Sequence, residues 1–146
     1  MNTRILLLIC FTLLTNCETK KITETNKDII KNLSPDVDNG GLFIPEGFGA
    51  IVVSDGVGPS RHLAVKNNGD IYVKLRKASG RNGNVALRDN DGDGKADIIE
   101  RFGDYPNDGK FGTEMKINDG YLYYTSELVV YRQLLDPYEL IPKGKP

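Results

Sequence analysis

Acidic side chains alternate along residues 89–100, which read DNDGDGKADIIE. The spacing fits the calcium-loop pattern D-x-[DN]-x-[DN]-G-x5-E, in which carboxylate and carbonyl oxygens surround one cation. Gly94 stands where such a loop needs a sharp turn. The expected calcium ligands are the side chains of Asp89, Asp91, Asp93, Asp97 and Glu100, together with the backbone carbonyl of Lys95.

The segments on either side of this loop distinguish it from an EF-hand. VALR (85–88) and ADIIERF (96–102) look like strands, whereas an EF-hand loop lies between two helices. If the second strand begins near Ile98, the side chain of Glu100 turns away from the metal. The alternative is a solvated acidic turn without an ion. The crowding of the carboxylates favours calcium, with a dissociation constant on the order of 10⁻⁴–10⁻³ M.

His62 is the only histidine of the chain, and Arg61 precedes it. Together they can bind an anionic or polyhydroxylated group, or His62 can accept a proton. A histidine that only forms a structural hydrogen bond at a strand end is the simpler interpretation, because no second acid–base group lies nearby in the sequence. The acidic loop has no histidine ligand and no nucleophile beside it. The sequence therefore predicts no catalytic residue.

The N-terminus has the features of an export signal. Residues 1–4 include a basic side chain, and residues 5–14 form an apolar run of about ten residues, too short to span a bilayer as a helix. LTNC (14–17) resembles a bacterial lipobox, although its third position is usually Gly or Ala. We expect a signal peptide over residues 1–16, lipidation of Cys17 and an exported protein anchored in the cell envelope. The alternative is an ordinary secretory signal with an incidental cysteine.

Residues 17–41 are polar and lack a sustained hydrophobic period, which predicts a disordered tether between the lipid and a domain over residues 42–146. The two cysteines of the chain are Cys10 and Cys17, so no disulfide is available to the domain. Its core, or a metal, must hold the fold. With 19 basic and 20 acidic residues and no basic patch, a nucleic-acid partner is not expected.

Short apolar segments alternate with turns rich in Gly, Asn and Asp from residue 42 onward, which predicts an all-β fold. Asn68-Gly69 and Asp119-Gly120 each separate two apolar segments, a strong hairpin signal. Residues 76–83 and 105–112 are expected to be loops. The expected strands are 48–54, 61–66, 71–76, 84–88, 96–102, 114–117, 121–126, 128–134 and 139–142.

A repeat is present within this region. RHLAVKNNGDIYVKL aligns with GTEMKINDGYLYYTS, which places Gly69 and Gly120 51 positions apart, and VALR aligns with VVYR, which places Arg88 and Arg132 44 apart. A repeat of about 40–50 residues made of four short strands is typical of a propeller blade, and a generic β-meander is the alternative.

The expected fold class is therefore all-β, with antiparallel four-stranded blades in a partial β-propeller of about one and a half to two blades. Propellers normally close with four or more blades, because each blade buries its faces against its neighbours. We expect the chain to be a fragment of a longer protein, a degenerate copy, or a protein that assembles with others.

Three segments carry a resemblance to a known family: FIPEGFGAIVVSDGVGPSRHLAVKNNGDIYVKLR (43–76), GNVALRDNDGDGKADIIERFGD (83–104) and DGYLYYTSELVVYRQLL (119–135). They resemble the start of the sorbosone dehydrogenase-like proteins, relatives of the soluble pyrroloquinoline-quinone-dependent glucose dehydrogenases. The resemblance covers about residues 42–142, and the middle segment is its most specific part. It implies an exported six-bladed propeller that oxidises sugars or aldoses, with the quinone and calcium at the channel mouth.

In that family the catalytic histidine and most cofactor contacts come from later blades. The resemblance therefore assigns Arg61 and His62 only to the lining of the channel near the cofactor, and it assigns no catalytic residue here. The acidic loop is peripheral in this scheme and is separate from the calcium site of the quinone.

The expected function is the N-terminal part of a quinone-dependent sugar dehydrogenase-like propeller, inactive alone. Calcium is the expected cofactor, and pyrroloquinoline quinone is expected only in a full-length relative. The expected partners are a sugar or aldose substrate in the full-length context, the membrane through the lipid anchor, and further blades or other copies of the chain. The alternative is a calcium-stabilised cell-surface β module that binds a partner or glycan without catalysis.

Overall fold

A computed structural model of the chain describes residues 33–104 and 112–146. The chain divides into two compact units, Met1–Lys31 and Asn32–Pro146, and all described residues belong to the second. The predicted signal peptide, Cys17 and residues 17–32 of the predicted tether lie outside the described residues. Within the described ranges, no helix has the length and apolar character that a membrane span requires.

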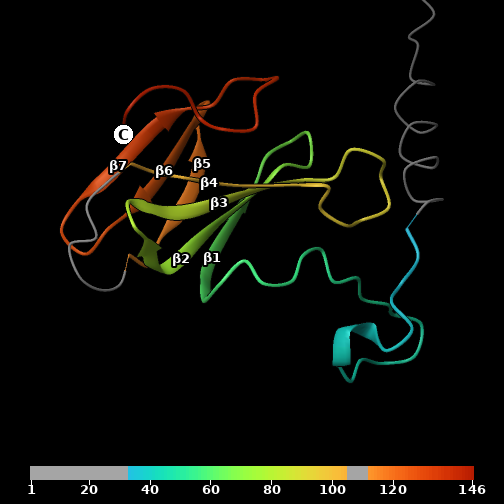
Figure 1. The fold of residues 1–146 in the computed structure, drawn as a ribbon. Helices are drawn as coiled ribbons and strands as arrows, with labels where there is room; N and C mark the ends of the chain where they lie inside the picture. Colours follow the sequence, from blue (N-terminus) through green and yellow to red (C-terminus); the bar gives the residue numbers. More distant parts are fainter. Residues whose placement is uncertain (1–32, 105–111) are drawn as a thin grey trace, which may run out of the picture. The chain divides into compact units, whose positions relative to one another are not determined.

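The strands form two antiparallel sheets, each a simple meander (Figure 1). The four-stranded sheet has the order β1-β2-β3-β4 and the three-stranded sheet the order β5-β6-β7. The expectation of an all-β antiparallel fold is confirmed, and the strands of the described residues do not close into a ring. The strands are β1 (Ser60–Val65), β2 (Ile71–Ser79), β3 (Asn82–Arg88), β4 (Ile98–Phe102), β5 (Met115–Asn118), β6 (Tyr121–Thr125) and β7 (Val130–Leu134), and a 3₁₀ turn, η1, spans Asn39–Gly41.

Both predicted hairpins are present, with different turns. Between β5 and β6, Asp119 and Gly120 have φ angles of 48° and 74°, as a two-residue type I′ turn requires. Between β1 and β2 only Gly69 has positive φ, and its N–H donates to the Lys66 carbonyl oxygen at 2.9 Å. The first hairpin loop is longer, because the ladder ends at the pair Val65 and Ile71.

Three predicted elements differ from the structure. Residues 48–54 form no strand, and the Val53 carbonyl instead accepts a hydrogen bond from the Ala96 N–H at 2.8 Å. The predicted loop 76–83 is a hairpin, because β2 continues to Ser79 and β3 starts at Asn82. The predicted strand 139–142 is absent, and the chain forms a single bridge just after it, between Leu134 and Lys143. In each case the sequence lacks information about which neighbouring strand is available for pairing.

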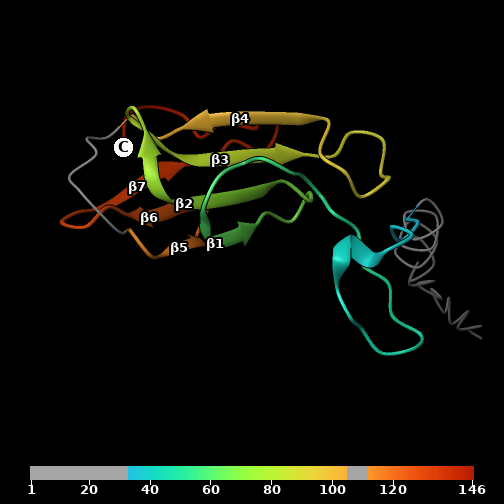
Figure 2. The ribbon, with the colours of Figure 1, turned by 60° about the horizontal axis from the view of Figure 1, so that its bottom comes forward.

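The two sheets pack face to face (Figure 2). The ring of Phe102 lies edge-on to Tyr72 at 5.9 Å and to Tyr124 at 6.4 Å, which links the sheets through favourable aromatic geometry. We call the packed faces the inner faces. They are formed by Ala64, Tyr72, Ala86 and Phe102 on the four-stranded sheet and by Met115, Ile117, Leu122 and Tyr124 on the three-stranded sheet, with Leu140 beside them.

The outer face of the four-stranded sheet forms a second, smaller core. Val73, Leu75, Val85 and Leu87 are buried there. Val53 and Val57, from the segment that precedes β1, pack against them. The sheet is therefore apolar on both faces, like a strand layer placed between two neighbours.

The ladder registers refine the repeat. Tyr72 pairs with Ala86, and its equivalent Tyr123 pairs with Arg132, so Arg132 corresponds to Ala86 and not to Arg88. The predicted alignment of VALR with VVYR is therefore wrong by two positions. In the first strands, the pair Leu63–Val73 corresponds to Met115–Tyr124, so Met115 is the equivalent of Leu63 and not of Ala64, and the predicted alignment is off by one position there.

This correspondence has a consequence for packing. Leu122 and Tyr124 lie on the inner face of the three-stranded sheet, but their equivalents Ile71 and Val73 lie on the outer face of the four-stranded sheet. The two sheets thus contact each other through different faces of the repeat, in a head-to-tail manner.

Candidate metal centre

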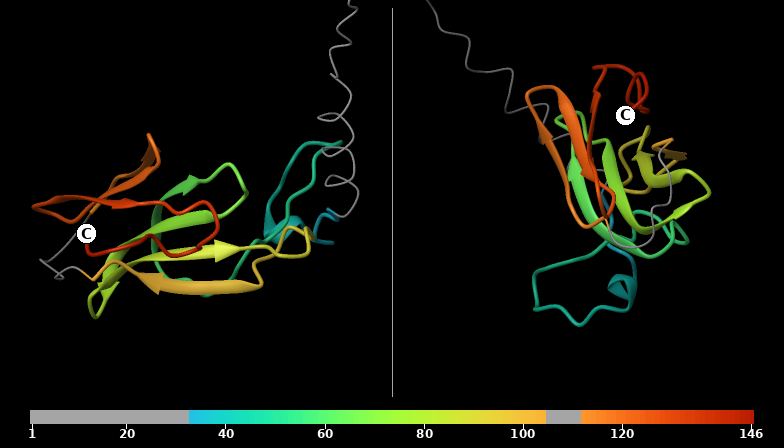
Figure 3. Two further views of the ribbon diagram at one scale, coloured as in Figure 1. Left: turned by 90° about the horizontal axis from the view of Figure 1, so that it is seen from above. Right: turned by 90° about the vertical axis from the view of Figure 1, so that its left-hand side faces the viewer.

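The acidic loop connects β3 to β4 at one end of the four-stranded sheet, where it is drawn in yellow (Figure 3). Its base is closed by the Asp97 N–H, which donates to the Arg88 carbonyl oxygen at 2.9 Å. Gly92 and Gly94 have φ angles of 80° and 88°, a region that L side chains rarely adopt. The two glycines therefore allow the chain to fold back on the first aspartate of the loop.

Asp89 organises the loop from within. Its Oδ1 accepts the N–H of Gly92 at 2.7 Å and of Asp91 at 3.2 Å, and its Oδ2 accepts the N–H of Gly94 at 2.8 Å. Burial opposes ionisation of this carboxyl, but the backbone donors of Gly94, Gly92 and Asp91 outweigh it, and the pKa of Asp89 lies below its usual value. Asp89 is therefore anionic at neutral pH.

Three of the predicted ligands are brought together. Asp89, Asp91 and Asp97 each place a carboxylate oxygen within 4.8 Å of the others. Asp97 is held in place because its Oδ2 accepts the Asn90 N–H at 2.7 Å. The cluster thus joins the first and the last parts of the loop around one point.

The carboxylates of Asp93 and Glu100 are not among those that converge. Asp93 Oδ1 accepts the Lys95 N–H at 2.7 Å, which turns its carboxylate back along the chain. Glu100 lies inside β4, opposite Ala86 in the ladder. The strand that begins at Ile98 thus separates Glu100 from the cluster, as the strand context of the loop predicts.

The donor set of the cluster suits a hard divalent cation. Carboxylate oxygens are the ligands that calcium and magnesium prefer, and three negative charges this close repel one another unless a cation neutralises them. The positively charged side chain of the loop, Lys95, does not neutralise the cluster, because its Nζ lies 2.9 Å from Asp36 Oδ1. The residues present therefore fit calcium.

The loop also fastens the segment that precedes β1. Asp36 pairs with Lys95, and its other carboxylate oxygen accepts the Val52 N–H at 2.7 Å. Both hydrogen bonds lower the pKa of Asp36, and the bond from the Val52 N–H has the larger effect. A Cβ placed on Gly94 would lie 2.9 Å from the side chains of Ile51 and Leu33. Residues 33–41, assigned above to the tether, thus contain groups that contact the loop and residues 50–53.

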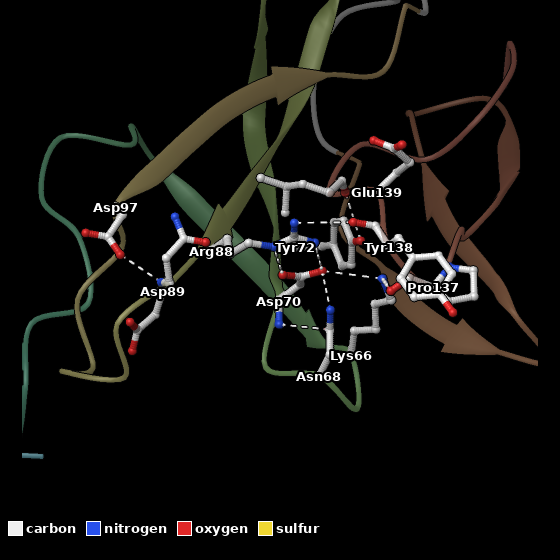
Figure 4. A network of polar contacts seen from close by, with 12 residues as sticks. Lys66, Asn68, Asp70, Tyr72, Arg88, Asp89, Asp97, Pro137, Tyr138 and Glu139 are labelled. Carbon is white, nitrogen blue, oxygen red and sulfur yellow. Dashed lines mark hydrogen bonds and ion pairs between the residues drawn. The ribbon is translucent and has the colours of Figure 1, made fainter. Parts of the chain in front are cut away.

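A buried ion-pair network, not foreseen from the sequence, lies on the other side of Arg88 (Figure 4). Asp70 is 2% exposed, and Arg88 reaches it with Nε–Oδ1 at 2.6 Å and Nη2–Oδ2 at 2.7 Å. Asn68 Nδ2 donates to Asp70 Oδ2 at 2.9 Å, and Lys66 Nζ lies 3.4 Å from the same oxygen. Burial opposes the charge of Asp70, but these partners, Arg88 foremost, hold its pKa below the usual value.

The network ties the first hairpin to the chain that follows β7. Lys66 Nζ donates to the Asp136 carbonyl oxygen at 2.7 Å, and the Tyr72 hydroxyl donates to the Leu140 carbonyl oxygen at 2.9 Å. Burial raises the pKa of Tyr72 to about 12. The only sequence signal was an Asp and an Arg at the ends of neighbouring apolar strands. The network is a brace between the sheets and offers no reacting group.

Arg61 and His62 line a groove of about 720 Å³ on the outer side of β1. His62 Nδ1 lies 3.3 Å from the Thr113 carbonyl oxygen and 3.4 Å from Glu114 Oε1. His62 thus faces the segment that leads into β5, and Ile71 and Val73 lie in the same groove. The groove is lined mostly by apolar side chains, with the cationic Arg61 at its rim.

Comparison of the chain with protein-family models, with curated proteins and with solved structures gave no match.

Proposed function

We propose that residues 42–146 are the first blades of a sorbosone dehydrogenase-like propeller, the sequence class that they resemble. The observation that carries this proposal is the head-to-tail packing of two successive meanders. The equivalent edge strands β1 and β5 contact each other, and the inner face of one sheet packs on the opposite face of the next repeat. Successive propeller blades pack in this way around a common axis.

In this proposal the chain has a structural part in a sugar-oxidising protein. β1 and β5 lie nearest the axis, so Arg61 and His62 line the channel, and no residue of this chain is assigned to the chemistry. Pyrroloquinoline quinone, when bound, supplies two-electron oxidation of an aldose in the complete protein. The chain alone is expected to be inactive, because the resemblance places the catalytic histidine and most cofactor contacts in later blades.

The acidic loop is proposed to bind calcium through Asp89, Asp91 and Asp97, with the Lys95 carbonyl and water completing the shell. The support is the convergence of three carboxylates in a loop of hard oxygen donors. Calcium then holds β3, β4 and the segment that precedes β1 together. Its role is stabilising and not catalytic.

The protein is further proposed to be exported and anchored in the cell envelope through a lipid on Cys17. The support is the apolar run that ends at LTNC (14–17). Growth with a radiolabelled fatty acid tests this point. Label is expected on the wild-type chain and absent from the Cys17→Ser variant, and equal labelling of both would contradict the anchor.

The propeller proposal is tested by reading the gene beyond codon 146 and by assaying its product. Further repeats with a histidine-bearing strand, in any frame, are expected. If such repeats are found, a protein expressed with them joined in frame to this chain should reduce an electron-acceptor dye in the presence of aldoses, added quinone and calcium. Residues 1–146 alone should not. A stop codon followed by an unrelated gene, or aldose oxidation by the present chain alone, would contradict the proposal.

The groove beside Arg61 and His62 favours a second candidate function, a calcium-stabilised surface module that binds a glycan or protein without catalysis. Its apolar floor and cationic rim are the specific observation. Calcium-dependent retention of the chain on a glycan array, lost in Arg61→Ala, would support this function over the first.

A further inference from the structure

The outer face of the four-stranded sheet exposes apolar side chains at positions that are buried between the sheets in the second repeat. Leu63 is 57% exposed, whereas its repeat equivalent Met115 is 2% exposed against the other sheet. Val65 is 54% exposed, whereas its equivalent Ile117 is partly buried. The repeat therefore uses these positions to pack one sheet on another, and in the first sheet they meet solvent.

The segment that precedes β1 covers only part of this face. Val53 and Val57 pack on Val73 and Leu87 toward the middle of the sheet. Beside β1 a groove remains, with Leu63 along it. The segment that precedes β1 therefore leaves the edge strand β1 partly uncovered on this face. In the three-stranded sheet, the equivalent edge strand β5 contacts the neighbouring sheet.

The outer face of the three-stranded sheet is open in a complementary way. Tyr123 is the equivalent of Tyr72, which is fully buried between the sheets, yet Tyr123 is only partly buried. On the same face Val130 is 71% exposed, and its equivalent Asn84 is fully buried. This face repeats the one through which the first sheet contacts the second.

We propose that the outer face of the three-stranded sheet of one copy docks on the outer face of the four-stranded sheet of a second copy. The proposal rests on the blade arrangement proposed above and names the partner of its free faces. Joining these two faces reproduces the contact between the inner faces of the four-stranded and three-stranded sheets within one chain. Such a contact is heterologous, so copies add head to tail and form a ring when the rotation closes.

Charges on the two faces set the salt dependence of this contact. Arg61 and Arg101 are exposed on the outer side of the four-stranded sheet, and Lys116 and Arg132 are exposed on the outer side of the three-stranded sheet. Like charges repel, and salt screens exposed charges beyond about 8–10 Å. Association through these faces therefore strengthens as the salt concentration rises.

Sedimentation velocity of the full chain in a fixed concentration of mild detergent tests the proposal. The wild type is expected to shift to multiples of the monomer mass as protein concentration rises. Leu63→Lys and Val130→Lys, one on each face, are each expected to remain monomeric. An equimolar mixture of the two is expected to form dimers and nothing larger, because each variant keeps one intact face. Phe43→Lys, a fully exposed apolar residue on neither face, is the matched control and associates like the wild type.

Several results would overturn the proposal. These are a wild type that stays monomeric at every concentration, a Val130→Lys variant that still dimerises alone, and association that weakens as salt is added. A cooperative thermal transition by circular dichroism, recorded for every variant, shows that loss of association is not loss of folding. The reading of the gene tests the family assignment separately, because self-association requires only the blade-like repeat of the two sheets and not the later blades.

Discussion

The carboxylate of Asp70 is buried, and each of its oxygens accepts a hydrogen bond from Arg88. Removing one partner of a buried ion pair costs more than the pair contributes, because the remaining charge keeps its desolvation cost. Asp70→Asn is expected to lower the free energy of unfolding by about 3 kcal/mol, measured by urea denaturation.

The exposed pair of Arg81 and Asp104, with Nε–Oδ1 at 2.6 Å, is the natural control. Water screens an exposed ion pair, so Asp104→Asn should leave the urea midpoint nearly unchanged. Equal shifts for Asp70→Asn and Asp104→Asn would contradict the interpretation of the Asp70 network as a buried brace.

The lowered pKa of Asp70 also predicts a pH dependence. Its ordinary value is 3.8, and the folded protein holds it lower, so the unfolded chain binds the proton more tightly. The stabilisation is fully present above the ordinary pKa and is lost as pH falls through the folded pKa. Between pH 6 and about pH 3, wild-type stability should fall more than that of Asp70→Asn. Parallel pH profiles would contradict this assignment.

The acidic loop illustrates how an element depends on its glycines. Gly94 has φ 88°, and an added Cβ would meet Ile51 and Leu33 at 2.9 Å. Gly120 has φ 74°, and nothing lies within 4 Å of its added Cβ. Backbone strain alone costs about 1–2 kcal/mol for an L residue in this region.

Gly120→Ala is therefore expected to cost about 1 kcal/mol and Gly94→Ala more, because the latter adds a steric conflict. Urea denaturation of both variants measures the difference in the free energy of unfolding. A Gly120→Ala variant that is the less stable of the two would show that the contact between the loop and residues 33–51 is unimportant.

Local chemistry explains which elements could be predicted. The hairpins at Gly69 and Gly120 follow from turn residues that tolerate positive φ, and the acidic loop follows from the spacing of its aspartates. The prediction failed for residues 48–54, where an apolar β-branched run packs as an extended segment without a ladder. A strand requires a neighbour with free backbone groups, and sequence periodicity does not reveal that neighbour.

The Asp70 network shows a second reason why part of the structure escaped prediction. Arg88 lies 18 positions from Asp70, and the Asp136 carbonyl lies 70 positions from Lys66, which donates to it. The pairing appears only once the two sheets are packed. The position of Glu100 relative to the cluster likewise depends on the structure, because β4 begins at Ile98 and includes it.

The two sheets share one aromatic core, and each exposes a different outer face. Phe102 contacts Tyr124 across the sheets, and the chain after β7 is held by Tyr72. The sheets should therefore unfold together. The acidic loop lies at the end of the four-stranded sheet and fastens residues that precede β1, so calcium bound there should stabilise the entire unit.

A ligand that binds only the folded state stabilises it by about 2.7 kcal/mol at a free concentration of 100 times its Kd. Asp91→Asn, which removes a proposed ligand, is expected to abolish the response to calcium and to be no less stable than the wild type without calcium, because it relieves carboxylate repulsion. Glu100→Gln, an acidic residue outside the cluster, is the matched control and should retain the response.

Thermal unfolding of the full chain, recorded with millimolar calcium and with a calcium chelator, tests whether the acidic loop is a stabilising calcium site. We predict one cooperative transition, with a midpoint several degrees higher in calcium for the wild type and for Glu100→Gln and unmoved for Asp91→Asn. A wild-type midpoint that is the same with calcium and with the chelator would contradict the claim that the acidic loop is a calcium site that stabilises this fold.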